Sequence, residues 1–60
     1  MVTTANLSAI WRLIDEGVEV PGWVARCDED LHILMRTEDQ ATWSRQSGET
    51  LWLPVWPDMP

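Results

Sequence analysis

The apolar residues near the N-terminus recur with the period of a helix. They fall at positions 7, 10, 11 and 14, the i, i+3, i+4, i+7 spacing of one helical face. A side-chain oxygen of Thr4 or Asn6 can cap the start. Gly17 can take the left-handed position after the last turn, with the next residue folding back as in a Schellman ending. The pattern therefore predicts a helix over about 6–16.

After Pro21 and Gly22 the period changes from helical to two, which is typical of strands. Apolar and polar residues alternate before and after an acidic turn at residues 28–30, which predicts a β-hairpin. A three-residue loop pairs Cys27 with Leu31, whereas a two-residue loop mixes His32 and Arg36 into the apolar face. Because one face must be buried, the three-residue register is favoured. Its apolar face would comprise Trp23, Ala25, Cys27, Leu31, Ile33 and Met35.

Residues 41–56 predict a second hairpin that turns at Ser47 and Gly48. The residues expected on its inner face are Trp43, Leu51, Leu53 and Val55, with Trp52 and Trp56 pointing outward. A helix over 37–47 is the alternative, since Thr37 and Gln40 fit a capping box. Its apolar stripe is poor, so the hairpin is slightly preferred and residues 38–47 stay open between strand and helix.

These elements predict an α+β fold, with one N-terminal helix packed on a small antiparallel β-meander of three to four strands. The chain would be a single small domain, 1–60, with loose termini at 1–4 and 57–60. Three prolines from Pro54 onward should end regular structure. The expected core is Leu7, Ile10, Trp11, Leu13, Ile14, Trp23, Ile33, Met35, Leu51 and Leu53.

Length and charge narrow the function classes. The chain has 60 residues, ten acidic and four basic, and a formal charge of -6. A domain of this size buries only about 60% of its unfolded surface, so little of it is spare for an enzyme cleft. Four arginines against ten acids do not form the basic patch that phosphate binding needs. The charge either serves solubility alone or imitates a nucleic acid.

Cys27 is the only cysteine, so no internal disulfide can form. We therefore expect a reducing, cytoplasmic location. The N-terminal segment lacks the basic region of a signal peptide, and no apolar run approaches a membrane span. Lys, Phe and Tyr are absent, which fits a G/C-rich bacterium or its phage or plasmid. The location would then be the bacterial cytoplasm, or the host cytoplasm for a phage-encoded protein.

The sequence offers no catalytic group, cofactor motif or metal site. In the preferred register, His32 lies on the opposite face from Cys27, so a Cys–His dyad is not expected. One Cys and one His cannot complete a structural zinc site, and the acidic turn lacks the calcium-loop pattern. No nucleotide-binding glycine motif is present. The sequence therefore predicts no enzyme and no cofactor.

Acids and tryptophans instead suggest a binding surface. The acids divide between the ends of the predicted sheet, with 28–30 and 49 at one end and 15, 16, 19, 38 and 39 at the other. Tryptophan and arginine are enriched in interface hot spots. The outer face of the sheet should carry Val24, Arg26, His32, Leu34, Arg36, Ser44, Trp52 and Trp56. The predicted partner-binding residues are Asp28, Glu29, Asp30, Glu38, Asp39, Arg26, Arg36, Trp52 and Trp56.

The segment 10–17, followed by Val20, Pro21, Gly22 and a hairpin, is similar to one piece of a winged helix-turn-helix excisionase, its recognition helix and wing. The similarity covers about half of the chain. The first helix of that motif is missing, and its basic residues are mostly absent. The resemblance implies, at most, a degenerate DNA-associated protein.

Three hypotheses follow. The first is a small acidic, non-enzymatic inhibitor of the phage or mobile-element type, which occupies a basic, nucleic-acid-handling protein of the host. The second is a structural or regulatory subunit, acting as a homodimer or accessory chain. The third is the DNA-associated protein. The first needs a protein partner with a basic surface and neither direct nucleic-acid binding nor a membrane.

Overall fold

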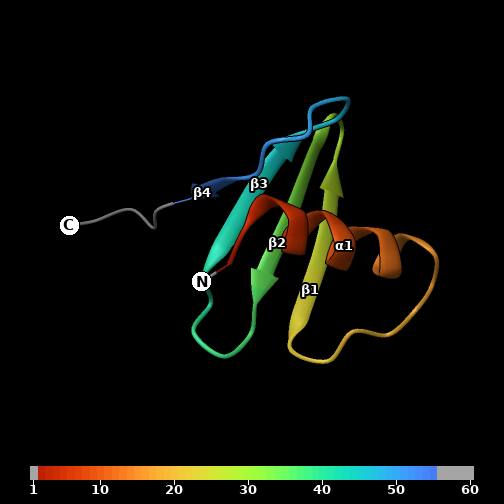
Figure 1. The fold of residues 1–60 in the computed structure, drawn as a ribbon, viewed down its shortest axis with the longest axis vertical. Helices are drawn as coiled ribbons and strands as arrows, with labels where there is room; N and C mark the ends of the chain where they lie inside the picture. Colours follow the sequence, from red (N-terminus) through yellow and green to blue (C-terminus); the bar gives the residue numbers. More distant parts are fainter. Residues whose placement is uncertain (1, 56–60) are drawn as a thin grey trace.

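The computed structural model describes residues 2–55 of the chain. Within this range, one helix packs on one face of a four-stranded antiparallel sheet with strand order β1-β2-β3-β4 (Figure 1). The predicted α+β meander is thus confirmed, and the segment left open between strand and helix forms β3. The elements are α1 (Thr4–Asp15), β1 (Trp23–Asp28), β2 (Leu31–Arg36), β3 (Thr42–Gln46) and β4 (Leu53–Val55).

The helix begins earlier than its periodicity predicts. Thr3 is the N-cap, and its Oγ1 accepts a hydrogen bond of 3.2 Å from the backbone N–H of Asn6. The prediction of Thr4 or Asn6 as the cap is therefore wrong. Val2 packs against the core. Residues 1–4 were expected to be a loose terminus, but Thr3 caps α1 and Thr4 is its first residue. The other segment expected to be loose, 57–60, lies outside the described range.

The end of α1 is a Schellman motif, as predicted. Gly17 has φ 88°, a backbone conformation that favours glycine. The N–H of Val18 donates to Leu13 O at 2.9 Å, and the N–H of Gly17 donates to Ile14 O at 3.0 Å. These bonds satisfy carbonyls of the last turn and direct the chain back toward β1.

The first hairpin forms, but its predicted register is wrong. Cys27 pairs with His32 and Asp28 with Leu31, which leaves Glu29 and Asp30 as a two-residue turn. Glu29 takes φ 54°, in the left-handed region that a tight hairpin turn requires. A shift of one residue moves every side chain of β2 to the other face of the sheet.

The face covered by α1 therefore differs from the predicted inner face. By the alternation of the strands, the covered face carries Trp23, Ala25, Cys27, His32, Leu34, Arg36, Trp43 and Arg45. Leu34, expected to point outward, is fully buried there at 0% exposure. Ile33 and Met35, expected in the core, lie on the opposite face.

Aromatic packing explains how polar side chains of β2 tolerate the covered face. The His32 ring stacks on Trp11 of α1, with centroids 4.3 Å apart and planes at 14°. The guanidinium carbon of Arg36 lies 5.5 Å from the centroid of the Trp43 ring. Large indole rings thus pack against an imidazole and a guanidinium on the covered face. The hydrophobic pattern of the sequence predicts aliphatic side chains of β2 at these positions.

The second hairpin is also confirmed as β3 and β4, but its faces differ from the prediction. Trp43 pairs with Pro54, so Leu53 and Val55 lie on the face away from α1. Trp52, expected to point outward, is 4% exposed and its Nε1–H donates to Ser8 Oγ at 3.2 Å. Regular structure continues through Pro54 to the end of β4.

The core lies between α1 and the sheet. Leu7, Leu34 and Trp52 are buried. Partly buried side chains packed around them are Val2, Ile10, Trp11, Ile14, Trp23, Ala25 and Trp43. Of the residues predicted for the core, Leu13, Leu51 and Leu53 are exposed at 41%, 59% and 56%. The tryptophans of the described residues thus supply much of the core that the aliphatic residues were expected to fill.

Candidate functional site

Within residues 2–55, one face of the sheet has no helix over it. We call it the helix-free face. Val24 and Val55 are 40% and 43% exposed there, and Ile33 is half-buried. Among residues 2–55, no other element covers this face (Figure 1). The face comprises Val24, Arg26, Asp28, Leu31, Ile33, Met35, Thr42, Ser44, Gln46, Leu53 and Val55. Three residues predicted for the outer face of the sheet lie on this face: Val24, Arg26 and Ser44. Four others predicted for it do not: His32, Leu34, Arg36 and Trp52.

A hollow of about 430 Å³ opens beside this face, between β3 and the connection to β4. Apolar side chains of Leu31, Leu51 and Leu53 form much of its wall, and the charged residues Arg45 and Glu49 also line it. The hollow has the composition that a binding pocket needs, with an apolar wall and a few polar groups.

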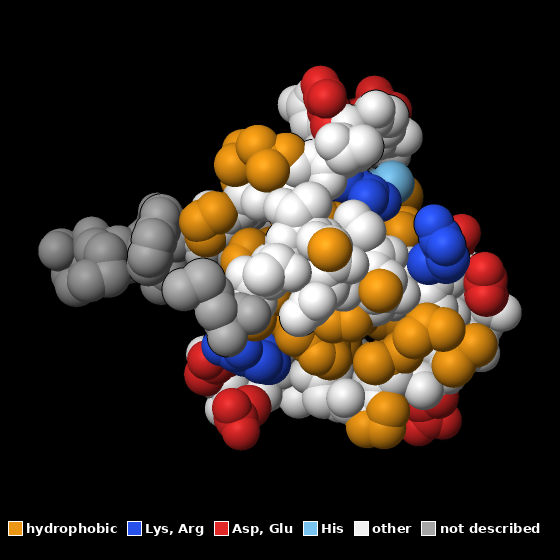
Figure 2. All heavy atoms as spheres, in the orientation of Figure 1, with side chains coloured by type: hydrophobic (Ala, Val, Ile, Leu, Met, Phe, Trp, Pro, Cys, Tyr) orange, Lys and Arg blue, Asp and Glu red, His pale blue; other side chains and the backbone are white. Residues whose placement is uncertain are grey.

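Acids gather at both ends of the sheet. Asp28, Glu29 and Asp30 lie at the β1–β2 turn, and the chain carrying Glu49 lies against them, since Ser47 N–H donates to Asp30 O at 2.7 Å. Figure 2 shows acidic side chains at this upper end and further groups at the lower side of the molecule. Glu38 and Asp39 lie in the β2–β3 turn, while Asp15 and Glu16 end α1.

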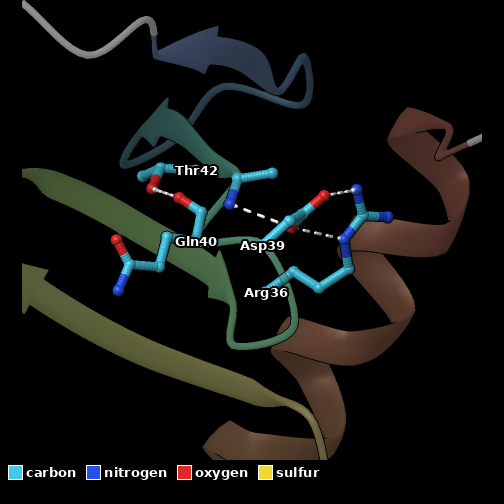
Figure 3. A network of polar contacts seen from close by, with 5 residues as sticks. Arg36, Asp39, Gln40 and Thr42 are labelled. Carbon is cyan, nitrogen blue, oxygen red and sulfur yellow. Dashed lines mark hydrogen bonds and ion pairs between the residues drawn. The ribbon is translucent and has the colours of Figure 1, made fainter.

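Arg36 and Asp39 form an ion pair that fixes the β2–β3 turn (Figure 3). Arg36 Nη2 and Nε donate to the two carboxylate oxygens at 2.7 and 3.0 Å, and Ala41 N–H donates to Oδ1 at 3.1 Å. The hydrogen bond from Arg36, followed by that from Ala41, lowers the pKa of Asp39 to about 2. The carboxylate likewise raises the pKa of Arg36. Both residues were predicted to bind a partner, and the structure joins them to each other.

The other predicted contact residues divide by exposure. Arg26 is exposed on the helix-free face. The acids Asp28, Glu29, Asp30 and Glu38 are also exposed, at the ends of strands and in the turns between them. Trp52 is buried in the core and cannot anchor a partner in this conformation. Trp56 lies outside the described residues.

Sequence reasoning missed an aromatic and cationic cluster under α1. The Arg45 guanidinium carbon lies 4.5 Å from the Trp52 ring centroid and 5.9 Å from that of Trp11. Its Nη2 donates to His32 Nδ1 at 3.1 Å. Arginine has no acceptor, so His32 Nδ1 is the acceptor in this contact. Arg45 Nε is buried and has no hydrogen-bond partner within residues 2–55. Only the correct register could have brought these side chains together.

The same register changes the argument against a Cys–His pair. Cys27 and His32 face each other on adjacent strands, so their predicted placement on opposite faces is wrong. The imidazole nevertheless stacks on Trp11 and accepts from Arg45. The thiol of Cys27 is directed to Glu29 O at 3.7 Å. This arrangement lacks the nucleophile–base hydrogen bond of a catalytic dyad.

Beside Cys27, a groove of about 240 Å³ separates α1 from β1. It is lined by Trp11, Ile14, Asp15, Ala25, Arg26 and Cys27. Within the described range, no three metal-ligating side chains converge, and α1 is too short and polar to cross a membrane.

Comparison with models of protein families, with curated protein sequences and with solved structures finds no match to this chain. Any functional interpretation therefore rests on the residues and surfaces described above.

Proposed function

We propose that the chain is a small, non-enzymatic binding protein that occupies a basic, nucleic-acid-handling protein, in the manner of an inhibitor encoded by a phage or mobile element. The observation that carries this proposal is the helix-free face, where exposed and half-buried apolar side chains of β1, β2 and β4 lie among Arg26, Thr42 and Ser44, with acids at both ends of the sheet. A monomer gains nothing by leaving such a face in water, because burying apolar surface stabilises by about 25 cal/mol per Å².

The face suggests which residues would make apolar contacts with the partner and which would make charged ones. Val24, Ile33 and Leu53 would pack against apolar groups of the partner. Carboxylates of the β1–β2 turn and Glu49 would meet lysines and arginines that normally hold phosphates. The hollow beside β3 would accept the aliphatic stem of a basic side chain whose charged end reaches Glu49.

The experiment is a pull-down of host proteins from the lysate of a G/C-rich bacterium, with the immobilised protein and two variants as bait. Ile33→Glu places a charge at the centre of the helix-free face, and Leu13→Glu adds the same charge at an exposed site on α1. We expect a nucleic-acid-binding protein to be retained by the wild type and Leu13→Glu, and lost with Ile33→Glu. Added DNA or RNA and raised salt should release it. The proposal is contradicted if the same protein is retained in the presence of nucleic acid, at raised salt and on the Ile33→Glu variant.

A homodimer or accessory subunit is the second candidate, and the same face supports it, because a second copy could bury the exposed apolar side chains. Sedimentation separates the two candidates. A stable dimer that Ile33→Glu dissociates favours the subunit, whereas a monomer with a basic partner favours the inhibitor.

A degenerate DNA-associated protein is a lesser candidate, since Arg12 and Arg26 are both exposed. It predicts that Arg12→Ala or Arg26→Ala abolishes a DNA mobility shift. Absence of any shift at low salt removes this candidate.

A further inference from the structure

The two edges of the sheet differ in what they present to a further strand. β4 is a three-residue edge strand, and its central residue is Pro54. The N–H of Arg36 donates to Ala41 O, so odd-numbered residues of β3 bond to β2 and even-numbered ones bond to β4. Pro54, opposite Trp43, therefore has its ring nitrogen at the outward position, where a proline blocks strand addition.

β1 is a six-residue edge strand without proline. The N–H of Thr37 donates to Gly22 O at 2.9 Å, which sets the phase of the β1–β2 ladder. Because the bonding alternates, Val24 and Arg26 bond to β2, whereas Ala25 and Cys27 direct their N–H and C=O outward. Within residues 2–55, no backbone group bonds to these outward positions. The edge thus presents donors and acceptors spaced for another strand.

α1 covers this edge on one face of the sheet. In Figure 1 its C-terminal half crosses β1 and continues beyond the strand. The groove of about 240 Å³ lies here, between Trp11 and Ile14 of α1 and Ala25 of β1. The small side chain of Ala25 leaves room under the helix. A strand added beside β1 would therefore gain backbone hydrogen bonds and a place for its apolar side chains.

The charges around the groove select the occupant. Asp15 and Arg26 both line it, and Glu16 follows at the end of the helix. Asp28 ends β1 and Glu29 begins the turn. Four carboxylates thus lie around a groove that one guanidinium, Arg26, also lines, so the net charge there is negative, which suits a segment with Lys or Arg near its ends and repels an acidic one.

We propose that the β1 edge and the groove beneath α1 bind an extended, basic segment of a partner protein as an added strand. Its inward side chains would be small and apolar, to fit between Ile14 and Ala25. This inference goes beyond the proposed function, because it names a second site and its occupant. A protein that bound nothing through its helix-free face could still bind a strand here.

A second copy of the chain is a poorer occupant for the same edge. Two antiparallel copies of β1 in one sheet are related by an axis perpendicular to that sheet, so both helices lie on the same face. Since each α1 extends beyond its own β1, the two helices would compete for the space over the joined edges.

The probe is an acetylated, amidated peptide, Lys-Val-Thr-Val-Thr-Val-Lys, titrated into the isotope-labelled full chain and followed by NMR. We expect the amide signals of Ala25 and Cys27 to shift and their hydrogen exchange to slow. A peptide with the same side chains but N-methylated at alternate residues should bind about tenfold more weakly, as loss of one or two hydrogen bonds predicts. A version with Glu in place of Lys should also bind more weakly.

Cys27→Pro removes one outward N–H without removing a bond of the β1–β2 ladder, and Cys27→Ala is its matched control. We expect Cys27→Pro to abolish peptide binding and Cys27→Ala to retain it, with Ile33→Glu also retaining it. Equal binding of the N-methylated peptide, shifts confined to the helix-free face, or no binding overturns the inference. A dimer that Cys27→Pro dissociates overturns the choice of occupant. Because Ile33→Glu tests the helix-free face alone, the two proposals can fail separately.

Discussion

The two faces of the sheet are composed of different kinds of side chain, and the difference is opposite to what hydropathy suggests. The covered face buries Leu34 but also holds His32, Arg36 and Arg45 among indole rings. The helix-free face carries aliphatic residues such as Val24 and Ile33. Aliphatic character alone therefore did not decide which face is buried.

The reason lies in the shape and number of the tryptophans. Trp11, Trp23, Trp43 and Trp52 pack on the side of α1, and flat rings stack on imidazole and guanidinium groups as well as on apolar ones. The helix brings Trp11 and Leu7 to the sheet, so the face that bears the other rings becomes the core. The face left over retains exposed apolar side chains such as Val24 and Val55.

The largest expected difference between the faces comes from truncating adjacent residues of β2. Leu34→Ala should lower the free energy of unfolding by about 3 kcal/mol, because Leu34 is fully buried. A core of this size supplies only about 3–5 kcal/mol, so that variant should retain at most about 2 kcal/mol of stability. Ile33→Ala on the other face should lose about 1 kcal/mol. Urea unfolding measures both, and equal losses would contradict the assignment of the faces.

Exchanging arginine for lysine on each face should give a smaller difference. Arg45→Lys loses the flat contact with Trp52 and the hydrogen bond to His32, which should lower stability by about 1–2 kcal/mol. Arg26→Lys, on the helix-free face, should stay within about 0.5 kcal/mol of the wild type. Thermal unfolding of the two variants makes the comparison at constant charge.

The turn that sets the register allows a sharper test. Glu29 adopts φ 54°, which asparagine tolerates better than glutamate, so Glu29→Asn should stabilise by about 0.5 kcal/mol. Asp30→Asn removes the same charge from the neighbouring turn position and is the control. If both variants change stability equally, charge and not backbone conformation is responsible, and the two-residue turn loses its support.

The smallest effect concerns the pairing of Arg36 with Asp39 at the edge of the covered face. The pKa of Asp39 falls from 3.8 to about 2, so the ionised carboxylate stabilises the fold above pH 3.8 and this contribution disappears as pH falls through about 2. The melting temperature of Asp39→Asn should lie slightly below the wild type at pH 7 and converge with it near pH 2. Glu38→Gln, with the same change of charge beside it, controls for net charge. A difference that persists at pH 2 would contradict this origin.

Much of the local structure follows from the sequence. The spacing of apolar residues located α1, and Gly17 marked its Schellman ending. The change of period after Gly22 located β1 and β2, and Gly48 marked the connection from β3 to β4. These features depend on residues close in the chain, whose conformational preferences act over a few positions.

The surfaces that we propose for binding could not be located from the sequence as well as the elements, because they depend on the register. Alternation in β2 offered Leu31, Ile33 and Met35 on one face and only Leu34 among polar neighbours on the other. Choosing the first set separated Cys27 from His32. Placing Leu51 and Leu53 on the inner face of the second hairpin put Trp52 among the predicted partner-binding residues. Sequence patterns give no sign that His32 would stack on Trp11, a contact across 21 positions that forms only when α1 docks.

The sequence by itself determined the class of fold, the extents of most elements and the acids at the turns, because periodicity and turn chemistry are local. The tertiary structure alone decided which face is buried, which edge is open and which charges are paired. Those outcomes depend on how α1 and its rings fit the sheet, and a shift of one residue in β2 is enough to reverse them.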